Sequence, residues 1–154
     1  YSGIRPAVNA GLSVSRVGGA AQTKAIRTVA GTLRLDLAQY RELVTFAQFG
    51  TDDLDSATKA QLERGQRATE ILKQGQNQPL SMAQQTSILF ALVNGYLDDV
   101  ELTKIGSFEK AFHDFMGSNH PEILDGVTEA KAITEELNGL LKAAVEEFKA
   151  SVPY

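Results

Sequence analysis

Arg16 is the residue whose type and setting best fit phosphate chemistry. It lies in the segment 13–19 (SVSRVGG), where an extended stretch is predicted to turn through two glycines into a helix. A guanidinium is permanently charged and presents a planar fork of N–H donors that matches a phosphate group. Arg16 is therefore a candidate for anion recognition, and the alternative is a solvated arginine at the start of a helix.

The histidines and the lack of cysteine argue against a metal site. His113 and His120 are seven positions apart, so they lack the spacing of four that directs two imidazoles at one ion from a single helix. The sequence has no cysteine, which excludes disulfides, thiolate ligands and cysteine nucleophiles and fits a reducing compartment. We predict no metal site.

Three aspartates close together could form a calcium loop or a capped turn. The segment that contains Asp52, Asp53 and Asp55 has no glycine at the sixth position of such a loop. Leu54 stands where a calcium loop needs an oxygen ligand. Asp55 is instead placed to accept backbone N–H groups at the start of the next helix. We predict a polar turn that ends in a helix cap.

The two common glycine-rich phosphate loops do not occur in the sequence. Neither G-x-x-x-x-G-K-[ST] nor G-x-G-x-x-G is present, so the chain cannot by itself hold a triphosphate in either way. No nucleophile, metal set or carboxylate pair has convincing spacing for catalysis. We therefore expect no independent enzyme in this chain.

Charge and hydropathy narrow the range of partners. Fifteen Lys and Arg against nineteen Asp and Glu give a net charge of −4, the wrong sign for binding through phosphate neutralisation. The longest unbroken apolar run, residues 88–93, is far too short to cross a bilayer. We expect no nucleic-acid partner and no direct membrane insertion.

Helices must position these residues. From residue 20 onward the apolar residues recur every three or four positions, the period of a helix with one buried face. Ser81 and Gln84 have the spacing of a capping box and mark a helix start. Three apolar stripes indicate the core of a bundle: Leu33, Leu37, Tyr40, Val44 and Ala47; Ile105, Phe108, Phe112 and Phe115; and Ile133, Leu137, Leu140, Leu141, Ala144 and Phe148.

The segment before these helices has a different pattern. Residues 11–17 alternate small or polar with apolar side chains, which is typical of a strand or an extended arm. The predicted fold class is all-α, a helical bundle preceded by a short extended arm or strand. We place the domain boundary so that residues 1–19 form the arm and residues 20–154 form the helical domain.

Six strings resemble one family in order and spacing. The chain resembles the alpha subunit of F-type ATP synthase over essentially its whole length, in the region of the C-terminal helical domain and the last arm of the nucleotide-binding domain. We expect the chain to be a fragment of that longer subunit. The strings that carry the resemblance are GIRPA (3–7), GLSVSRVGGAAQ (11–22), LDLAQYRE (35–42), FAQFG (46–50), LKQGQ (72–76) and NGYLD (94–98).

The resemblance implies a role in a rotary complex. Members alternate with beta subunits in a ring around a rotating gamma shaft, with peripheral-stalk and ring subunits as further partners. The complex makes or hydrolyses ATP and couples this to proton transport, as a peripheral assembly on the cytoplasmic face of the bacterial inner membrane or its organellar equivalent. The resemblance assigns Arg16 as an arginine finger that reaches into the beta catalytic site.

The resemblance also implies a regulatory, non-catalytic nucleotide site on the alpha subunit. The resemblance places Arg5 and Pro6 from the arm, with Gln74 and Gln76, near the adenine. A glutamine amide suits such a position, since it can both donate and accept along the adenine edge. ATP or ADP with Mg²⁺ is expected in the intact complex, and no tightly bound nucleotide is expected in the chain alone. On the residues alone, Gln74 and Gln76 are instead interpreted as the polar flanks of a helix end.

The same resemblance places the aspartate turn against the rotor. Asp52, Asp53 and Asp55 would form this rotor-facing turn, which is one residue longer than the family pattern at residues 51–53. By itself the fragment is expected to be inactive. The alternative function is a helical protein–protein interaction module with no enzyme attached, which composition and periodicity fit equally well.

Overall fold

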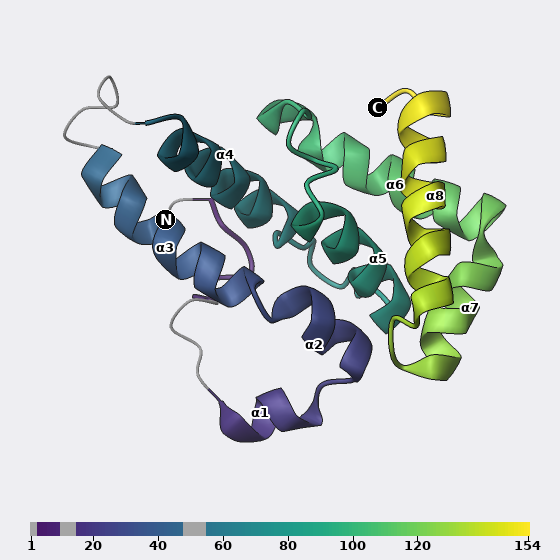
Figure 1. Cartoon of the computed structure of the whole chain (residues 1–154). Helices are drawn as coiled ribbons and strands as arrows, with labels where there is room; N and C mark the ends of the chain where they lie inside the picture. Colours follow the sequence, from purple (N-terminus) through teal and green to yellow (C-terminus); the bar gives the residue numbers. More distant parts are fainter. Residues whose placement is uncertain (1–2, 10–14, 48–54) are drawn as a thin grey trace.

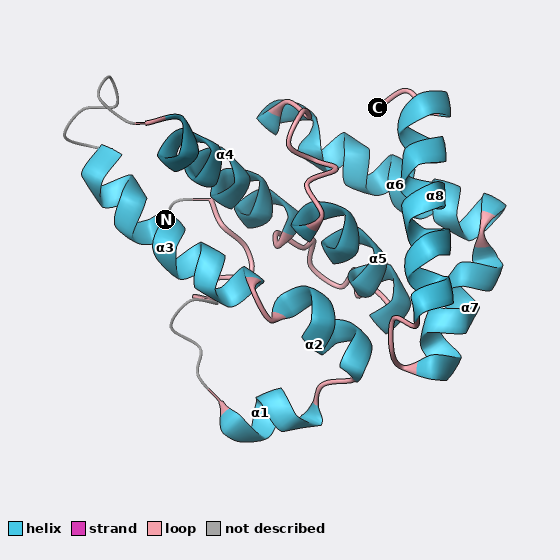
Figure 2. Ribbon diagram, viewed as in Figure 1, coloured by secondary structure: helices cyan, strands magenta, loops and turns pink. Residues whose placement is uncertain are grey.

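The computed structural model describes residues 3–9, 15–47 and 55–154, and every regular element within these ranges is helical (Figure 1, Figure 2). The predicted all-α class is therefore confirmed. The elements are α1 (Arg16–Ala21), α2 (Lys24–Ala30), α3 (Leu33–Ala47), α4 (Ser56–Ile71), α5 (Met82–Val93), the 3₁₀ helix η1 (Leu102–Lys104), α6 (Ile105–Asn119), α7 (Pro121–Ala130) and α8 (Glu135–Ser151).

The predicted strand or extended arm over residues 11–17 is wrong at its C-terminal end. Residues 10–14 lie outside the described residues, whereas Arg16 begins the first turn of α1. Ser15 has an extended backbone, and its Oγ accepts the Gly18 N–H at 2.9 Å. This serine is an N-cap, so its hydroxyl starts a helix where the alternation of side chains indicated a strand.

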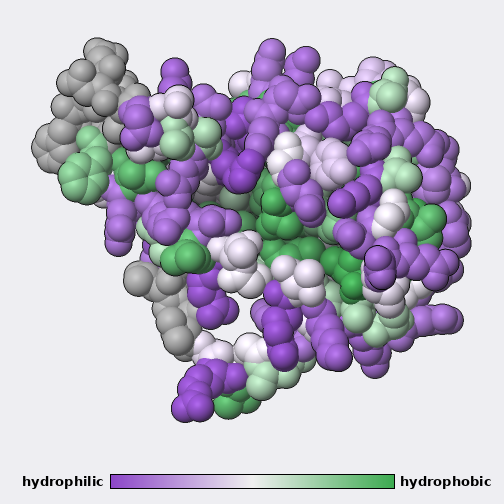
Figure 3. All heavy atoms as spheres, in the orientation of Figure 1, coloured by the Kyte–Doolittle hydropathy of each residue, from purple (hydrophilic) through white to green (hydrophobic). Residues whose placement is uncertain are grey.

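Helix α5 occupies the centre of the fold. It contacts α2, α4, α6, α7 and α8, and every residue of 86–92 is buried (Figure 1). Side chains on the face seen in Figure 3 are hydrophilic around the edge and more hydrophobic toward the middle, over the region of α5. The apolar run at 88–93 thus serves the core. In the three described ranges, no helix is both long and apolar enough to cross a membrane.

Helix α5 begins at the predicted capping box. The Ser81 Oγ accepts the Gln84 N–H at 3.2 Å, and the Gln84 side-chain oxygen accepts the Ser81 N–H at 2.9 Å. Both N–H groups would otherwise lack partners, because the first turn of a helix has no preceding carbonyls.

Aromatic rings from α6 and α8 pack together in the core. Phe148 meets Phe108 and Phe112 edge-on, with ring centroids 5.1 and 5.3 Å apart. This arrangement brings the positive edge of one ring to the negative face of another. All three side chains are fully buried, and the Tyr154 ring lies 4.9 Å from that of Phe108. The predicted stripe from 105 to 115 is confirmed, since all four of its residues are buried.

The predicted stripe on α8 has one error. Leu137, Leu141, Ala144 and Phe148 are buried, whereas Leu140 is 43% exposed. The buried positions follow one another at spacings of four, three and four. Because successive residues on a helix point about 100° apart, the side chain just before Leu141 leaves the buried face.

Helix α3 lies alongside α4 (Figure 1). Leu33 and Leu37 are buried as the stripe predicted, and Tyr40 is partly buried. Gly65 of α4 faces Tyr40 so closely that a Cβ at residue 65 would collide with the ring. This close approach positions α4, whose C-terminal end leads directly into residues 72–78.

Candidate functional site

Arg16 stands at the exposed start of α1. None of the residues of α1 is buried, and Ser15 is held in its capping geometry by the hydrogen bond to Gly18. The Arg16 guanidinium makes no hydrogen bond or ion pair with any residue that the structure describes. Within the described ranges its fork of donors is left unpaired, as contact with an anion on a neighbouring molecule would require.

A second group of predicted residues meets where the arm crosses the end of α4. The Gln74 backbone N–H donates to the Arg5 carbonyl at 2.9 Å, which joins the arm to the segment after α4. Arg5 and Gln74 line one cavity of about 340 Å³. The structure thus brings these two residues together, although 69 positions separate them (74 − 5 = 69).

The polar lining of this cavity is balanced in charge. Besides Arg5 and Gln74 it contains Glu70, Lys73 and Glu109. The Lys73 Nζ lies 2.6 Å from the Glu70 Oε1, so these two charges largely neutralise each other. The Gln74 side-chain nitrogen donates to the Gln78 carbonyl at 2.6 Å, which leaves the Gln74 amide oxygen as an acceptor. Such a lining fits a polar heterocycle.

Pro6 and Gln76 lie elsewhere. Pro6 lines a neighbouring, more apolar groove of about 460 Å³ together with Ile4, Leu37 and Tyr40. Burial, followed by the carboxylate of Glu70, raises the pKa of the Tyr40 phenol, which keeps it neutral at ordinary pH. Gln76 is exposed in the turn after α4 and lines neither space.

The aspartate turn is described only at its last member. Asp52 and Asp53 lie outside the described residues. Asp55 caps α4 as predicted: its Oδ1 accepts the Thr58 N–H at 2.8 Å and its Oδ2 accepts the Thr58 hydroxyl at 2.9 Å. The backbone hydrogen bond from Thr58 lowers the pKa of the Asp55 carboxyl.

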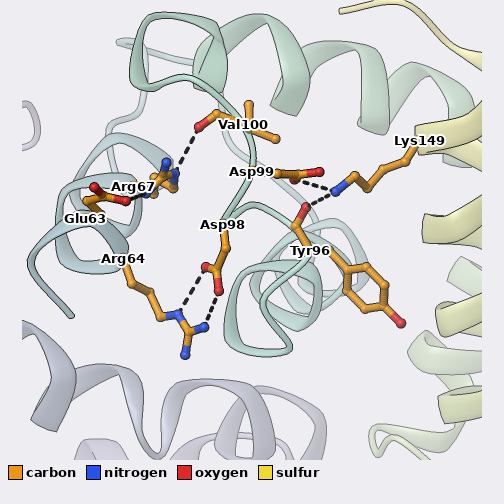
Figure 4. Close-up of polar contacts among 8 residues, drawn as sticks. All are labelled: Glu63, Arg64, Arg67, Tyr96, Asp98, Asp99, Val100 and Lys149. Carbon is orange, nitrogen blue, oxygen red and sulfur yellow. Dashed lines mark hydrogen bonds and ion pairs between the residues drawn. The ribbon is translucent and has the colours of Figure 1, made fainter. Parts of the chain in front are cut away.

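Polar contacts anchor α4 to the turn that follows α5 (Figure 4). Arg64 forms a two-point contact with the Asp98 carboxylate, including an Nε–Oδ1 hydrogen bond of 3.1 Å. Three residues further along α4, Arg67 donates to the Val100 carbonyl at 2.9 Å. Both arginines leave the same helix toward the same turn. These contacts fix the orientation of α4, and Gln74 follows its C-terminal end at the cavity.

The same turn is tied to α8 on its other side (Figure 4). The Lys149 ammonium donates to the Tyr96 carbonyl at 2.7 Å and to the Asp99 carboxylate at 2.5 Å. The Tyr96 hydroxyl lies 3.3 Å from a carboxylate oxygen of Glu146. The turn therefore links α4 to the C-terminal helix through side chains that come from both directions.

Neither histidine lines these cavities, although His113 lies next to Glu109, which does. The His120 ring lies between two carboxylates, 3.3 Å from Glu122 and 3.0 Å from Glu147. Neither ring nitrogen of His113 has a hydrogen-bond partner among the described residues, and its Nε2 lies 3.7 Å from the Glu109 Oε1. In the portions of the chain that the structure describes, no three His, Asp or Glu side chains are grouped so as to hold a metal ion.

Comparison with known proteins identifies the fold. The family model of the ATP synthase alpha/beta chain, C terminal domain, matches residues 22–148. The chain belongs to this family. The resemblance drawn from the six strings is therefore confirmed, and the family match covers α2 to α7 and most of α8.

Three ATP synthase alpha subunits illustrate how the chain relates to other members of the ATP synthase alpha/beta C-terminal domain family. The ATP synthase subunit alpha of Dehalococcoides mccartyi strain 195 is 55% identical over 148 residues, which is 96% of this chain and 29% of the relative. The ATP synthase alpha subunits of strains BAV1 and CBDB1 are each 51% identical over the same shares. The chain thus spans less than a third of the length of these relatives.

Sequence reasoning missed several residues around the site of this ATP synthase domain. Glu109 reaches the cavity from α6, and nothing local in the sequence marks it as a neighbour of Gln74. Lys73 could have been found, because it directly precedes Gln74. Arg27 of α2 also escaped notice, since its partners are the backbone carbonyls of Gly19 and Ala20, which no motif reveals.

Proposed function

We propose that the chain is the C-terminal part of the alpha subunit of a proton-translocating ATP synthase. Residues 1–19 would be the last arm of the nucleotide-binding domain and residues 20–154 the helical domain. The identity of 55% over 96% of the chain to a protein named ATP synthase subunit alpha supports this assignment. The proposed complex is peripheral to a membrane, on the cytoplasmic face of the bacterial inner membrane or its organellar equivalent.

The proposed partners follow from this assignment. Beta subunits would flank the chain in the ring, the gamma shaft would run through the ring, and peripheral-stalk and ring subunits would complete the assembly. Asp52, Asp53 and Asp55 would form the turn that faces the rotor. Asp55 is exposed and is engaged mainly in capping α4, so its part in a rotor contact would be secondary.

Arg16 would be the arginine finger of this subunit. The observation that carries this proposal is the exposed guanidinium at the start of α1, which has no partner among the described residues. Placed beside the transferring phosphoryl group in a beta site, it would neutralise charge that grows in the transition state without forming a covalent bond. Fingers of this kind increase turnover by about 10³ to 10⁵.

The cavity between the arm and α4 would be part of a regulatory, non-catalytic nucleotide site. Lys73 and Glu70 pair with each other, and the amide oxygen of Gln74, which has no partner among the described residues, can accept from an exocyclic amine such as that of adenine. Arg5 lines the same cavity, whereas Pro6 and Gln76 would act from its surroundings. ATP or ADP with Mg²⁺ would complete this site only in the intact complex.

The chain alone is expected to be inactive. It would supply one transition-state contact, and the sequence has neither common phosphate-binding loop. ATP turnover that stays with the chain through successive purification steps would contradict the proposal.

Purification of the natural protein tests its place in the complex. We expect it to co-purify with a beta subunit that carries a G-x-x-x-x-G-K-[ST] loop, at a fixed ratio by mass. A stable monomer with no such partner would favour the alternative, a helical interaction module.

A further inference from the structure

Helix α1 is not held in place by packing. None of its residues is buried, and Val17 is 81% exposed. In the space-filling view an open space separates α1 from α3 (Figure 3), and the ribbon shows α1 apart from the bundle below α2 (Figure 1). Burial of apolar surface is what usually stabilises so short a helix. Among the described residues, α1 is linked to the bundle by polar contacts rather than by burial.

One side chain contacts the end of α1 at several points. The Arg27 Nη2 lies 3.1 Å from the Gly19 carbonyl oxygen, 3.2 Å from that of Ala20 and 3.4 Å from that of Gln22. The last carbonyls of a helix have no partners within the helix, and they attract a cation. Arg27 therefore works as a C-terminal cap that comes from the next helix.

Helix α2 provides a firm base for this contact. Its residues Ala25 and Val29 are 0% and 1% exposed, and α2 packs against α5 in the centre of the fold. The Ala25 N–H also donates to the Lys131 carbonyl at 2.9 Å, which ties α2 to the turn after α7. Arg27 thus connects a helix fixed in the core to a helix that has no core contacts.

We infer that Arg27 is a positioning residue for Arg16. Through the carbonyls of Gly19, Ala20 and Gln22, Arg27 sets the direction of α1, and Arg16 is the first residue of that helix. This inference rests on the proposed role of Arg16 as the finger. Arg27 itself acts only through the backbone of α1 and touches no substrate.

The test uses the full-length subunit assembled with its beta and gamma partners. Arg27→Met keeps an unbranched stem up to about the position of Nε and removes the guanidinium donors. We expect multisite kcat for ATP hydrolysis to fall by about 10- to 100-fold with KM nearly unchanged, because small misplacements of a catalytic group have effects of this size. Arg27→Lys should restore much of the rate, since an ammonium can donate to the same carbonyls.

Two further variants make the result specific. Arg34→Met removes the same charge from an exposed arginine of α3, and we expect kcat near the parent value. In an Arg16→Lys background, Arg27→Met should cause little further loss, because both changes act on one function. Hydrogen exchange of the peptide 15–22 should become faster in Arg27→Met and stay unchanged in Arg34→Met.

The outcomes separate this inference from the proposed function. A normal rate of ATP hydrolysis in Arg16→Lys would show that Arg16 is not the arginine finger. A collapsed rate in Arg16→Lys together with a normal rate in Arg27→Met would keep the finger and overturn the positioning role. Unchanged exchange in residues 15–22 of Arg27→Met, or a full additional loss in the double variant, would also overturn it.

Discussion

Helix α1 and the pair α6–α8 are stabilised in opposite ways. The pair buries Phe108, Phe112 and Phe148 completely, and the Phe148 ring meets the other two rings edge to face. Helix α1 buries nothing and depends on the Ser15 hydroxyl at one end and the Arg27 guanidinium at the other. Core side chains thus provide stability, while a few directional hydrogen bonds place a charged group at the surface.

Substitution of the proposed functional residues should therefore impair function and change the stability of the fold only slightly. Arg16, Arg5 and Gln74 are all exposed and take no part in the core. Their loss would leave the fold intact and alter what the surface can bind. A core residue should behave in the reverse manner, and the following predictions probe both sides of this contrast.

Truncation in the aromatic cluster should have the largest effect on stability. Phe148→Ala removes a fully buried ring that contacts Phe108, Phe112 and Phe115, and should lower the free energy of unfolding by about 3 to 5 kcal/mol. Val17→Ala on α1 should change it by less than about 0.5 kcal/mol, because Val17 is 81% exposed. Urea titration measures the free energy of unfolding of both variants. Equal losses of stability would contradict the contrast between the two regions.

Removal of the two glutamines should affect binding and leave the fold unchanged. Gln74→Ala combined with Gln76→Ala should weaken nucleotide retention on the non-catalytic site by about tenfold, as expected for two hydrogen bonds of roughly 0.5 to 1.5 kcal/mol each. The beta sites should stay competent. Occupancy is measured on the purified complex, with Gln66→Ala on the exposed face of α4 as control. Unchanged occupancy would show that Gln74 and Gln76 do not contact nucleotide.

The cap at Asp55 should give the smallest effect, and one that depends on pH. Because the pKa of Asp55 is lower in the folded chain, its contribution to stability is present above its unfolded pKa of about 3.9 and is lost as pH falls through the folded pKa. Asp55→Asn keeps a capping oxygen but cannot titrate. The stability difference between the parent and Asp55→Asn should therefore shrink in acid, and a difference that grows would contradict this sign.

Local features of the fold could be predicted from the sequence. The Ser81–Gln84 box and the Asp55 cap involve residues three positions apart, so their spacing is sufficient evidence. The periodicity also located the core helices, because burial on one face repeats with the helical turn. Leu140 shows the limit: period alone did not decide which of two adjacent leucines faces the core.

Long-range features could not be predicted in this way. Glu109 lines the cavity with Arg5 although 104 positions separate them (109 − 5 = 104), and Lys149 joins the turn after α5 from the last helix. Such contacts depend on how helices pack, which no local spacing encodes. Arg27 was missed for a related reason, since its partners are backbone carbonyls and carry no side-chain signature. The role of Arg16 was inferred from family resemblance, because the residues around Arg16 fit both anion recognition and a solvated arginine.

The proposed role of Arg16 is to complete a catalytic site on a neighbouring subunit. Its most direct test is multisite ATP hydrolysis by the intact complex carrying Arg16→Lys, compared with Arg34→Lys on α3. The lysine keeps the charge and disturbs no core, so assembly and nucleotide binding should be nearly normal. A compact ammonium cannot reproduce the planar fork, so turnover should fall by about 10³ to 10⁵ while Arg34→Lys stays near the parent rate. A rate within a few-fold of the parent in a correctly assembled Arg16→Lys complex would contradict the account.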